Sequence, residues 1–590
     1  METNTNPLIE YFYSIGISPE TIKKSEYYKE NNFQKPEFLK PEVLNKFPPV
    51  KKPNSEIEPN IIISHCFPNG FKLVENTSTP EDEYFHFCLD NTPSRHTKNK
   101  YIYYTCLLFY ESLITYYNIQ KLINLDTKNA NINNNINTSN KDDSRPKLKK
   151  YKLETKSITS ININKSYLFE NFYVPKIICF CSFIPFPNEF KFLLKKIKDY
   201  SSGISGKTFI PVEKIIENIV ITFPRPIRGR FNLRIKKEHF LLNGEKNDFE
   251  ITQCDFNQYN FHSYRYQLIF TFSIENIIEI YKSLLLEIPI VFFSKYKEKL
   301  TNIVHTFLEL LSPFIYQYPT IAILPDDNLG IIEHSKTFVL GINHEWIEPG
   351  NGENFFTKKN ILIFNKPIRI CDIDNQNLDL YFNKKDEGSV ISFEDLGKNK
   401  TNHENSTTAN NNTDTSINNN IDENSPNTAY IITNENSNNI TGYQLPYHYC
   451  EKLKKRISAF FKEKINYNDY DPKINKKIGE EIFYYFLASI LQNYNIFLYN
   501  TEKEVESINK EIFTKSVYNI PIEKLIKIEN FLYENRSQER DFFIVFMNTK
   551  LFRNFLERKY LNRENDKYLF LHFDETILRK KNKKFFNKKN

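Results

Sequence analysis

Glycine, tryptophan and methionine are scarce in this chain, which contains 14 Gly, 1 Trp and 2 Met among its 590 residues. Its glycines form no GxxxxGKS/T phosphate loop, and the GxSxG, HExxH and protein-kinase signatures are also missing. These absences disfavour an enzyme that works through a covalent intermediate or a bound metal ion. We therefore predict no catalytic residue, no metal and no cofactor.

The 8 cysteines are scattered and include no CxxC pair, and the chain is far too long for a disulfide-stabilised miniprotein. No apolar run reaches the roughly 18 residues needed to span a bilayer, and the first residues, METNTNPLIEYFYS, lack the pattern of a signal peptide. We expect a cytoplasmic protein with reduced cysteines that meets membranes only indirectly. A net charge of +7 does not by itself predict a nucleic-acid partner, and none is expected.

What the chain does have is aromatic residues, 51 Phe and 37 Tyr, together with long polar stretches that lower its mean hydropathy to −0.54. Two Asn-rich segments have no apolar periodicity, so burial cannot offset the entropy of ordering them. These segments divide the sequence into ordered blocks. The predicted division is an N-terminal arm at 1–57, loosely docked; an α/β lobe at 58–236 with a disordered Asn-rich insertion near 126–165; a central domain at 237–392; an Asn-rich linker at 393–445; a helical part at 446–575; and a basic tail at 576–590.

The first lobe is expected to be rich in strands. The stretches NIIISHCF (60–67) and EYFHFCL (83–89) are predicted strands separated by a PNG turn. Two more apolar stretches, at 101–110 and 175–186, also predict strands. The amphipathic segment 187–201 predicts a helix that packs on them.

The central block shows the clearest periodicity. Apolar residues at 274, 277, 278, 281, 284 and 285 predict a helix with Ser273 as its N-cap. The stretch IVFF (290–293) then predicts a buried strand, and Ser294 is expected to cap the following helix. Further strands are expected at 320–324, 337–342 and 368–374, which gives a layered α/β domain. The last block predicts a small helical bundle.

Two groups of residues could hold a metal ion, and each has a simpler interpretation. His65, Cys66, His86 and Cys88 lie on predicted strands, but neighbours on one strand point to opposite faces, so a protein core is the alternative. Asp372 and Asp374 share a strand face and could bind Mg²⁺. Their alternative role is to accept hydrogen bonds at a strand end.

Two basic segments could bind phosphate groups. In PRPIRGR, Arg225, Arg228 and Arg230 could face a phosphate or nucleotide, whereas the alternative is a solvated basic turn. The C-terminal sequence LRKKNKKFFNKKN would suit anionic lipid or nucleic acid. Its alternative is a frayed, solvated terminus.

The central block resembles the central part of a DENN domain, and the flanking motifs follow in the order of that family. HCFPNGFKL resembles its upstream Cys-Phe-Pro-x-Gly motif, and RDFFIVFMNTKLFRNFLERK resembles its closing downstream helix. Together the similarity covers most of 58–376 and 479–565. The matching central positions are Ser273–Asn276, Leu284–Glu287, Ile290–Phe293, Ser294, Leu311–Phe314, Tyr318–Pro319, Leu324–Pro325, Gly341 and Cys371–Asn375.

This resemblance implies an α/β fold organised as a tripartite DENN module. Its parts would be a longin-like α/β N-terminal lobe (upstream DENN, 58–236), a central three-layer α/β lobe (237–392) and a helical downstream part (446–575). The implied activity is guanine nucleotide exchange on a Rab-type small GTPase in vesicle and membrane trafficking, with the GTPase bound between the lobes. Such a factor works only by binding the nucleotide-poor GTPase more tightly than the loaded form. The protein would stay peripheral to trafficking membranes.

Two other functions stay open from the residues alone. The chain could be a DENN-fold scaffold that binds a GTPase or partner complex without exchange activity. It could also be a GTPase-activating module that uses an arginine, with Arg228 or Arg230 as the residue to test.

Loops at strand ends are the expected contact surface for the GTPase, because ligands of open α/β sheets meet the carboxyl ends of strands. The polar loops at 325–330 and 333–337 contain the candidate contact residues Asp326, Asp327 and His334. Ordinary loop polarity is the alternative explanation for these residues.

Overall fold

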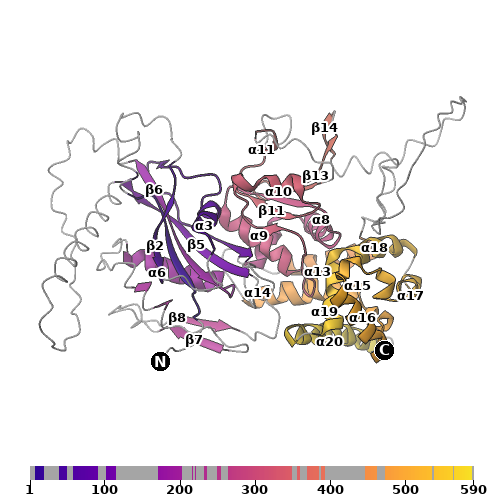
Figure 1. Ribbon diagram of the computed structural model, residues 1–590. Coiled ribbons are helices and arrows are strands. Elements are labelled where there is room, and N and C mark those ends of the chain that lie inside the picture. Colours follow the sequence, from indigo (N-terminus) through magenta and orange to yellow (C-terminus); the bar gives the residue numbers. More distant parts are fainter. Residues whose placement is uncertain are drawn as a thin grey trace, which may run out of the picture.

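The computed structural model describes three connected parts: an N-terminal α/β lobe, a central α/β lobe and a helical part that follows it (Figure 1). The low-complexity segments, Arg225, Arg228 and Arg230 lie outside the residues it describes. The described residues are 7–18, 21, 39–49, 57–90, 101–113, 171–201, 215–216, 219–220, 231–235, 249–253, 264–347, 355–358, 368–384, 387–391, 445–461, 472–534, 537–562 and 564–587.

The N-terminal lobe is built on a six-stranded antiparallel sheet with strand order β2-β1-β6-β5-β4, in which β3 also pairs with β6. Both faces of this sheet are buried. Along β5, Tyr104 and Cys106 point into one core while Leu107 and Phe109 point into another, which α6 (Pro187–Ser201) covers. The strands are β1 (Tyr11–Gly16), β2 (Glu42–Phe47), β3 (Val74–Glu75), β4 (Glu83–Asp90), β5 (Tyr101–Ser112) and β6 (Phe172–Ser182).

The prediction of a loosely docked arm at 1–57 is wrong for β1 and β2. All six residues of β1 are buried, and the strand pairs with β6 on one side and β2 on the other. The physical reason is that alternate residues of YFYSIG supply both faces of the sheet, with Tyr11, Tyr13 and Ile15 in one core and Phe12 in the other. The lysines and prolines that suggested an arm do not lie in this strand.

The stretch predicted as a strand at 60–67 is instead helical, as α3 (Pro59–Cys66). Pro59 stands at the start of this helix, where its fixed backbone angle suits the first turn. Ile62, His65 and Cys66 are its buried residues, and their i, i+3, i+4 spacing forms one helical face. Packing of that face against the sheet overrides the strand preference of three consecutive isoleucines.

The central lobe has the three layers that were predicted. Its mixed sheet has the order β10-β11-β9-β12-β13-β14, with β10, β11, β9 and β12 parallel. Along β9, Ile290 and Phe292 face α8 and α9, whereas Val291 and Phe293 face α10 and α11. The elements are α8 (Ile274–Leu285), β9 (Ile290–Phe293), α9 (Lys297–Glu309), β10 (Thr320–Ile321), α10 (Gly330–His334), β11 (Val339–Ile342), α11 (Phe355–Lys358), β12 (Ile368–Asp372), β13 (Asn377–Lys384) and β14 (Glu387–Ile391).

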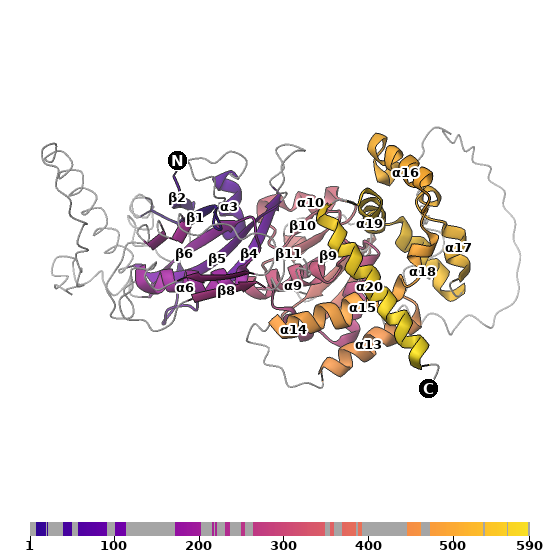
Figure 2. The ribbon, with the colours of Figure 1, turned by 90° about the horizontal axis from the view of Figure 1, so that it is seen from below.

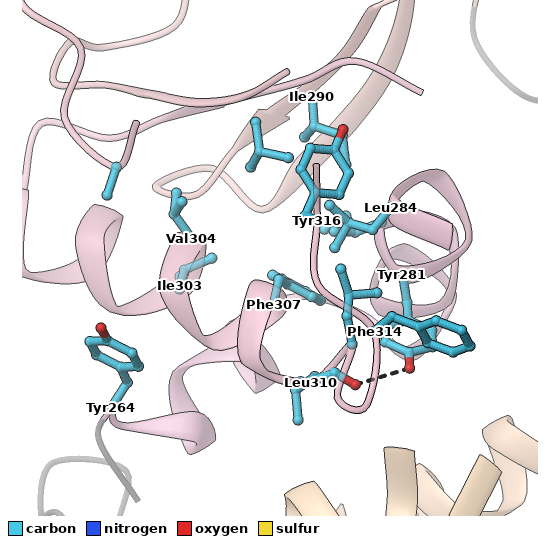
Figure 3. Close-up of a cluster of buried hydrophobic side chains, with 14 of the residues drawn as sticks. Tyr264, Tyr281, Leu284, Ile290, Ile303, Val304, Phe307, Leu310, Phe314 and Tyr316 are labelled. Carbon is cyan, nitrogen blue, oxygen red and sulfur yellow. Dashed lines mark hydrogen bonds between the residues drawn. The ribbon is translucent and has the colours of Figure 1, made fainter. Parts of the chain in front are cut away.

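Helix α8 begins as its sequence predicts, because the Ser273 hydroxyl accepts a hydrogen bond from the backbone N–H of Asn276 at 3.1 Å. Tyr281 on this helix donates to the backbone carbonyl of Leu310 at 3.0 Å, which joins α8 to the end of α9 (Figure 3). Ser294 does not cap α9, which begins three residues later at Lys297. The prediction of that cap is therefore wrong, since Ser294 instead bonds a neighbouring strand end.

Strands β7 (Phe231–Ile235) and β8 (Phe249–Gln253) pair as a separate two-stranded sheet. From residue 445 on, the described chain is helical and packs on the central lobe (Figure 1). Glu287 is one of several residues that join the two parts. It has a left-handed backbone angle of φ 55°, and its carboxylate accepts hydrogen bonds from the N–H groups of Lys550 at 3.0 Å and Leu551 at 2.7 Å. The helices are α13 (Tyr447–Phe461), α14 (Pro472–Lys476), the π-helix η5 (Lys477–Tyr484), α15 (Tyr485–Ile490), α16 (Glu502–Thr514), α17 (Ile528–Glu534), α18 (Ser537–Asn548), α19 (Lys550–Leu561) and α20 (Glu564–Asn587).

Candidate functional site

The carboxyl ends of the parallel strands β10, β11, β9 and β12 meet at one edge of the central sheet. The residues that follow β9, β11 and β12 form what we call the strand-end cluster: Ser294, Lys295, Tyr296, Asn343 and Asp374. Ser294 is fully buried, whereas Lys295 and Tyr296 are exposed, with 52% of the Tyr296 surface accessible to solvent. The cluster therefore has a buried base and an exposed rim.

A network of hydrogen bonds fixes the base of the strand-end cluster. The Asp374 carboxylate accepts from the Ser294 hydroxyl at 2.9 Å and from the Lys295 backbone N–H at 2.9 Å. The Asn343 side-chain amide donates to the carbonyls of Ser294 and Lys295, each at 3.0 Å. Because three strand ends are bonded to one another, the exposed side chains above them stand on a rigid support.

The N-terminal lobe contacts this same edge through the turn at Cys66–Gly70. The Asn69 side chain donates to the Asn343 carbonyl at 2.6 Å, and the Pro68 carbonyl accepts from the backbone N–H of Asp326 at 3.1 Å. Gly70 has a φ of 78, a conformation that disfavours any side chain and lets the turn close. The strand-end cluster therefore lies at the junction of the two lobes.

The lobes also meet along β4, the edge strand of the N-terminal sheet, which α9 covers. Lys297 of α9 is buried there, and its ammonium donates to the Cys66 carbonyl at 3.0 Å and lies 5.0 Å from the centre of the Phe85 ring. Burial lowers the pKa of Lys297, and the charge of Glu83 opposes that change. Both contacts tie the first turn of α9 to the N-terminal lobe.

A stack of three buried rings, His86, Tyr264 and His305, lies on the same seam. The ring centres of His86 and His305 are 5.1 Å apart, and each lies within 5 Å of Tyr264, at 4.6 Å and 4.9 Å. Burial lowers the pKa of both histidines, that of His305 to about 4. Both imidazoles are therefore neutral at physiological pH.

Comparison with known protein families finds two matches. Residues 41–109 match the uDENN domain, and residues 173–357 match the DENN (AEX-3) domain. This chain is a DENN family protein. The antiparallel N-terminal sheet, the mixed central sheet and the helical C-terminal part are consistent with a DENN module. The DENN match crosses the predicted boundary between 236 and 237, and the uDENN match begins inside the predicted arm, so the domain limits stay predictions.

In this DENN protein the predicted contact residues do not all lie together. Asp326 and Asp327 follow β10 at the carboxyl edge, next to the Cys66–Gly70 turn. His334 lies on the segment that returns to the start of β11, and three residues later Thr337 donates to the Glu287 carbonyl, ahead of β9, at 2.6 Å. The chain therefore leads from His334 to the amino edge of the sheet, opposite Asp326 and Asp327.

Residues that sequence reasoning missed complete the carboxyl edge. Lys295, Tyr296 and Asn343 lie directly after predicted strands, so the rule that selected Asp326 would also have selected them. Which of these residues lie together in the fold depends on which strands are neighbours in the sheet, and the local sequence does not show that. Arg228 and Arg230 lie outside the described residues, so their role stays a prediction.

Asp372 and Asp374 accept hydrogen bonds at the end of strand β12, which was the alternative to a Mg²⁺ site. Asp372 accepts from the backbone N–H groups of Asp374 at 3.0 Å and Asn375 at 3.1 Å. Within the described ranges, no three or more His, Cys, Asp or Glu side chains are grouped so that they could hold a metal ion. Nor does that part of the chain contain a helix long and apolar enough to cross a bilayer.

Proposed function

We propose that this DENN protein is a guanine nucleotide exchange factor for a Rab-type small GTPase and acts in vesicle and membrane trafficking, at the periphery of membranes. The observation that carries the proposal is the presence of both the uDENN and the DENN domain, because proteins of this family are generally Rab exchange factors. Exchange needs no nucleophile, base or metal from the factor. It needs a surface that holds the open GTPase more tightly than the nucleotide-loaded form.

The strand-end cluster supports this proposal as the place where such a surface is built. Speeding GDP release by roughly 10³–10⁵ requires preferential stabilisation of about 4–7 kcal/mol. Rigidly held side chains supply binding energy efficiently because little conformational entropy is lost when a partner docks. The exposed aromatic ring of Tyr296, with charged Lys295 and Asp327 nearby on the same edge, has the composition of an interface hot spot with a charged rim.

The proposal is tested by substituting the rim of the cluster and measuring GDP release. Tyr296→Ala is expected to lower the second-order rate constant of exchange by about 10- to 100-fold, the loss typical of a central aromatic contact. Tyr533→Ala is the matched control, because Tyr533 is an exposed tyrosine in the helical part, with 82% of its surface accessible. That control is expected to leave exchange unchanged.

Three results would contradict parts of the proposal. Full activity in both Tyr296→Ala and Asp327→Lys would place the GTPase on another surface. Binding of a GTPase without faster GDP release would favour a scaffold. Faster GTP hydrolysis that depends on Arg228 or Arg230 would favour a GTPase-activating module.

A further inference from the structure

Helix α20 (Glu564–Asn587) lies along the lower side of the helical part in Figure 1 and crosses its front in Figure 2. Its inner face is well anchored. Phe570, Phe573 and Ile577 are buried, and the rings of Phe570 and Phe573 contact Phe555 of α19. The Asp574 carboxylate accepts a hydrogen bond from the Tyr494 hydroxyl at 2.8 Å. The helix is therefore held in one orientation, with a defined outer face.

That outer face carries large apolar side chains. Tyr568, Leu571 and Leu578 are 55%, 56% and 57% exposed, and their spacing of three and seven residues aligns them along one stripe of the helix. Single exposed apolar residues are common on protein surfaces, but these three lie on one side of one helix. The exposed Glu575 lies between Leu571 and Leu578 and is paired with Arg579 at 3.4 Å. Water is a poor environment for the apolar stripe, so a partner that covers it would stabilise the protein.

Positive charge is concentrated at the C-terminal end of the same helix. The sequence after Glu575 contains no acidic residue and seven basic ones, and it includes two further phenylalanines, Phe585 and Phe586. The helical backbone continues through Asn587. The basic residues are Arg579, Lys580, Lys581, Lys583, Lys584, Lys588 and Lys589.

Basic groups also lie beside the stripe. His572 on α20 is partly buried, and burial followed by the positive charge of Arg579 lowers its pKa. The exposed Lys476 of α14 is close enough to contribute to the same effect. Arg579 and Lys476 therefore bring positive charge close to His572, whereas the charge of Glu575 acts in the opposite direction.

We propose that the outer face of α20 docks on the surface of a bilayer that contains anionic lipids. An apolar stripe of aliphatic and aromatic side chains, joined to a dense run of lysines, is the pattern of a helix that lies in the plane of the lipid headgroups. The leucines would enter the boundary of the acyl chains, and the basic residues would bind lipid phosphates and carboxylates.

Other occupants fit this face less well. Single-stranded nucleic acid binds through aromatic stacking, but two of the three exposed apolar residues are leucines, which have no π-face. A second copy of the chain in parallel orientation would bring two runs of lysines together, which is electrostatically unfavourable. A bilayer offers both an apolar layer and a negative surface, which matches the two halves of the helix. The proposal goes beyond GTPase exchange and does not depend on it.

The test measures sedimentation of the full chain with vesicles of phosphatidylcholine, with and without about a third of phosphatidylserine. We expect binding only to the anionic vesicles, and weaker binding as salt is raised, because exposed charges are screened. One variant replaces four lysines of the tail with glutamine, and its partition coefficient should fall about 100-fold or more. These lysines are Lys580, Lys581, Lys583 and Lys584.

A second variant, Leu571→Ser with Leu578→Ser, removes the apolar stripe without changing charge. Its partition coefficient should fall at least about tenfold, at low and high salt alike. Two matched controls make equivalent changes at exposed positions elsewhere in the helical part and should bind within about twofold of the unmodified chain. The controls are Ile496→Ser with Phe513→Ser, and Lys503→Gln with Lys510→Gln, Lys515→Gln and Lys524→Gln.

Several results would overturn the proposal. The first is failure of the unmodified chain to bind anionic vesicles. The second is equal binding by the α20 variants and their controls. The third is binding to a single-stranded oligonucleotide, lost in the four-lysine variant, without binding to vesicles. The fourth is a dimer in light scattering that the leucine variant abolishes, again without vesicle binding. Circular dichroism of each variant shows whether a loss of binding comes from loss of fold.

Discussion

Glu287 is one of the residues that join the central lobe to the helical part, and replacing it should loosen the start of α19. The Glu287 carboxylate accepts two hydrogen bonds, from the backbone N–H groups of Lys550 at 3.0 Å and Leu551 at 2.7 Å. Those N–H groups begin helix α19 and have no partner within the helix. Hydrogen bonds to a charged group are worth about 1.5–3 kcal/mol each, and measured helix caps contribute about 0.5–2 kcal/mol. We therefore expect Glu287→Ala to destabilise the first turn of α19 by about 2–4 kcal/mol.

The backbone of Glu287 allows a sharper test. Its φ of 55 is left-handed, where a residue with a side chain is strained by about 1–2 kcal/mol. Glu287→Gly relieves that strain but also loses the carboxylate, so it should be about 1 kcal/mol less destabilising than Glu287→Ala. Comparing how strongly the two variants are destabilised separates the contribution of the Glu287 side chain from that of its backbone conformation.

Native-state hydrogen exchange of the Lys550 and Leu551 amides measures this effect at the first turn of α19. A global unfolding curve would not isolate it, because a chain of several parts need not unfold in one step. Burial raises the pKa of Glu287 to about 7, so the measurement belongs near pH 8, where the carboxylate is ionised. Protection should fall roughly 30- to 1000-fold in Glu287→Ala. Thr501→Ala, which removes the cap of α16, should leave both amides unchanged. Unchanged protection in Glu287→Ala, or Glu287→Gly no better than Glu287→Ala, would refute the reasoning.

Other predictions concern the lobe junction and the central sheet. Burial lowers the folded pKa of His305 to about 4 and also lowers that of His86, so between about pH 6.5 and 4 the unfolded chain binds the His305 proton and the folded chain does not. Stability should therefore fall by up to about 1.4 kcal/mol per pH unit through His305 as the pH drops through this window, with His86 acting in the same direction, and His305→Phe should flatten the pH dependence of thermal unfolding. Gly341→Ala should destabilise by about 3 kcal/mol, because a Cβ there would lie 2.1 Å from a backbone oxygen, whereas a Cβ at Gly330 would make only an ordinary contact with His334 at 3.9 Å, so Gly330→Ala should be neutral in the same thermal assay. Lys297→Met removes a buried hydrogen bond between the lobes and should speed hydrogen exchange in the Cys66–Gly70 turn; unchanged exchange there would contradict a role in docking.

The helices and strands of the central lobe could be predicted because their signals are local and strong. The apolar positions of α8 repeat with helical spacing, and its N-cap Ser273 bonds as its residue type suggests. The strand at 290–293 is short and uniformly apolar, as a strand covered on both faces should be. For each of these elements, the apolar spacing or run and any capping residue lie within about fifteen consecutive residues.

The N-terminal lobe was harder because tertiary contacts decide its elements. The three isoleucines of α3 favour a strand locally, and only packing of one helical face reverses that preference. Strand β1 has six residues and lies among polar sequence, yet it pairs with β6, more than 150 residues later. Nothing in the local pattern of either segment indicates its partner.

The candidate site likewise contains some features that local sequence could indicate and others that depend on tertiary contacts. Asp326 and Asp327 were selected as contact candidates because they follow a predicted strand, and His334 was grouped with them although its segment leads into the next strand. Distinguishing the two requires the direction of β11, which is set by its parallel pairing with β10 and β9. The bond from Asn69 to Asn343 joins residues 274 positions apart, so no reading of local sequence could place the N-terminal turn on the strand ends.

Release of fluorescently labelled GDP from a panel of Rab-type GTPases, with the full chain added in catalytic amounts, tests the central claim most directly. The account predicts faster release from one or a few members of the panel, and a loss of that effect in Tyr296→Ala but not in Tyr533→Ala. Release that stays at its spontaneous rate for every member would contradict exchange activity, and binding to one of them in the same experiment would identify a scaffold instead.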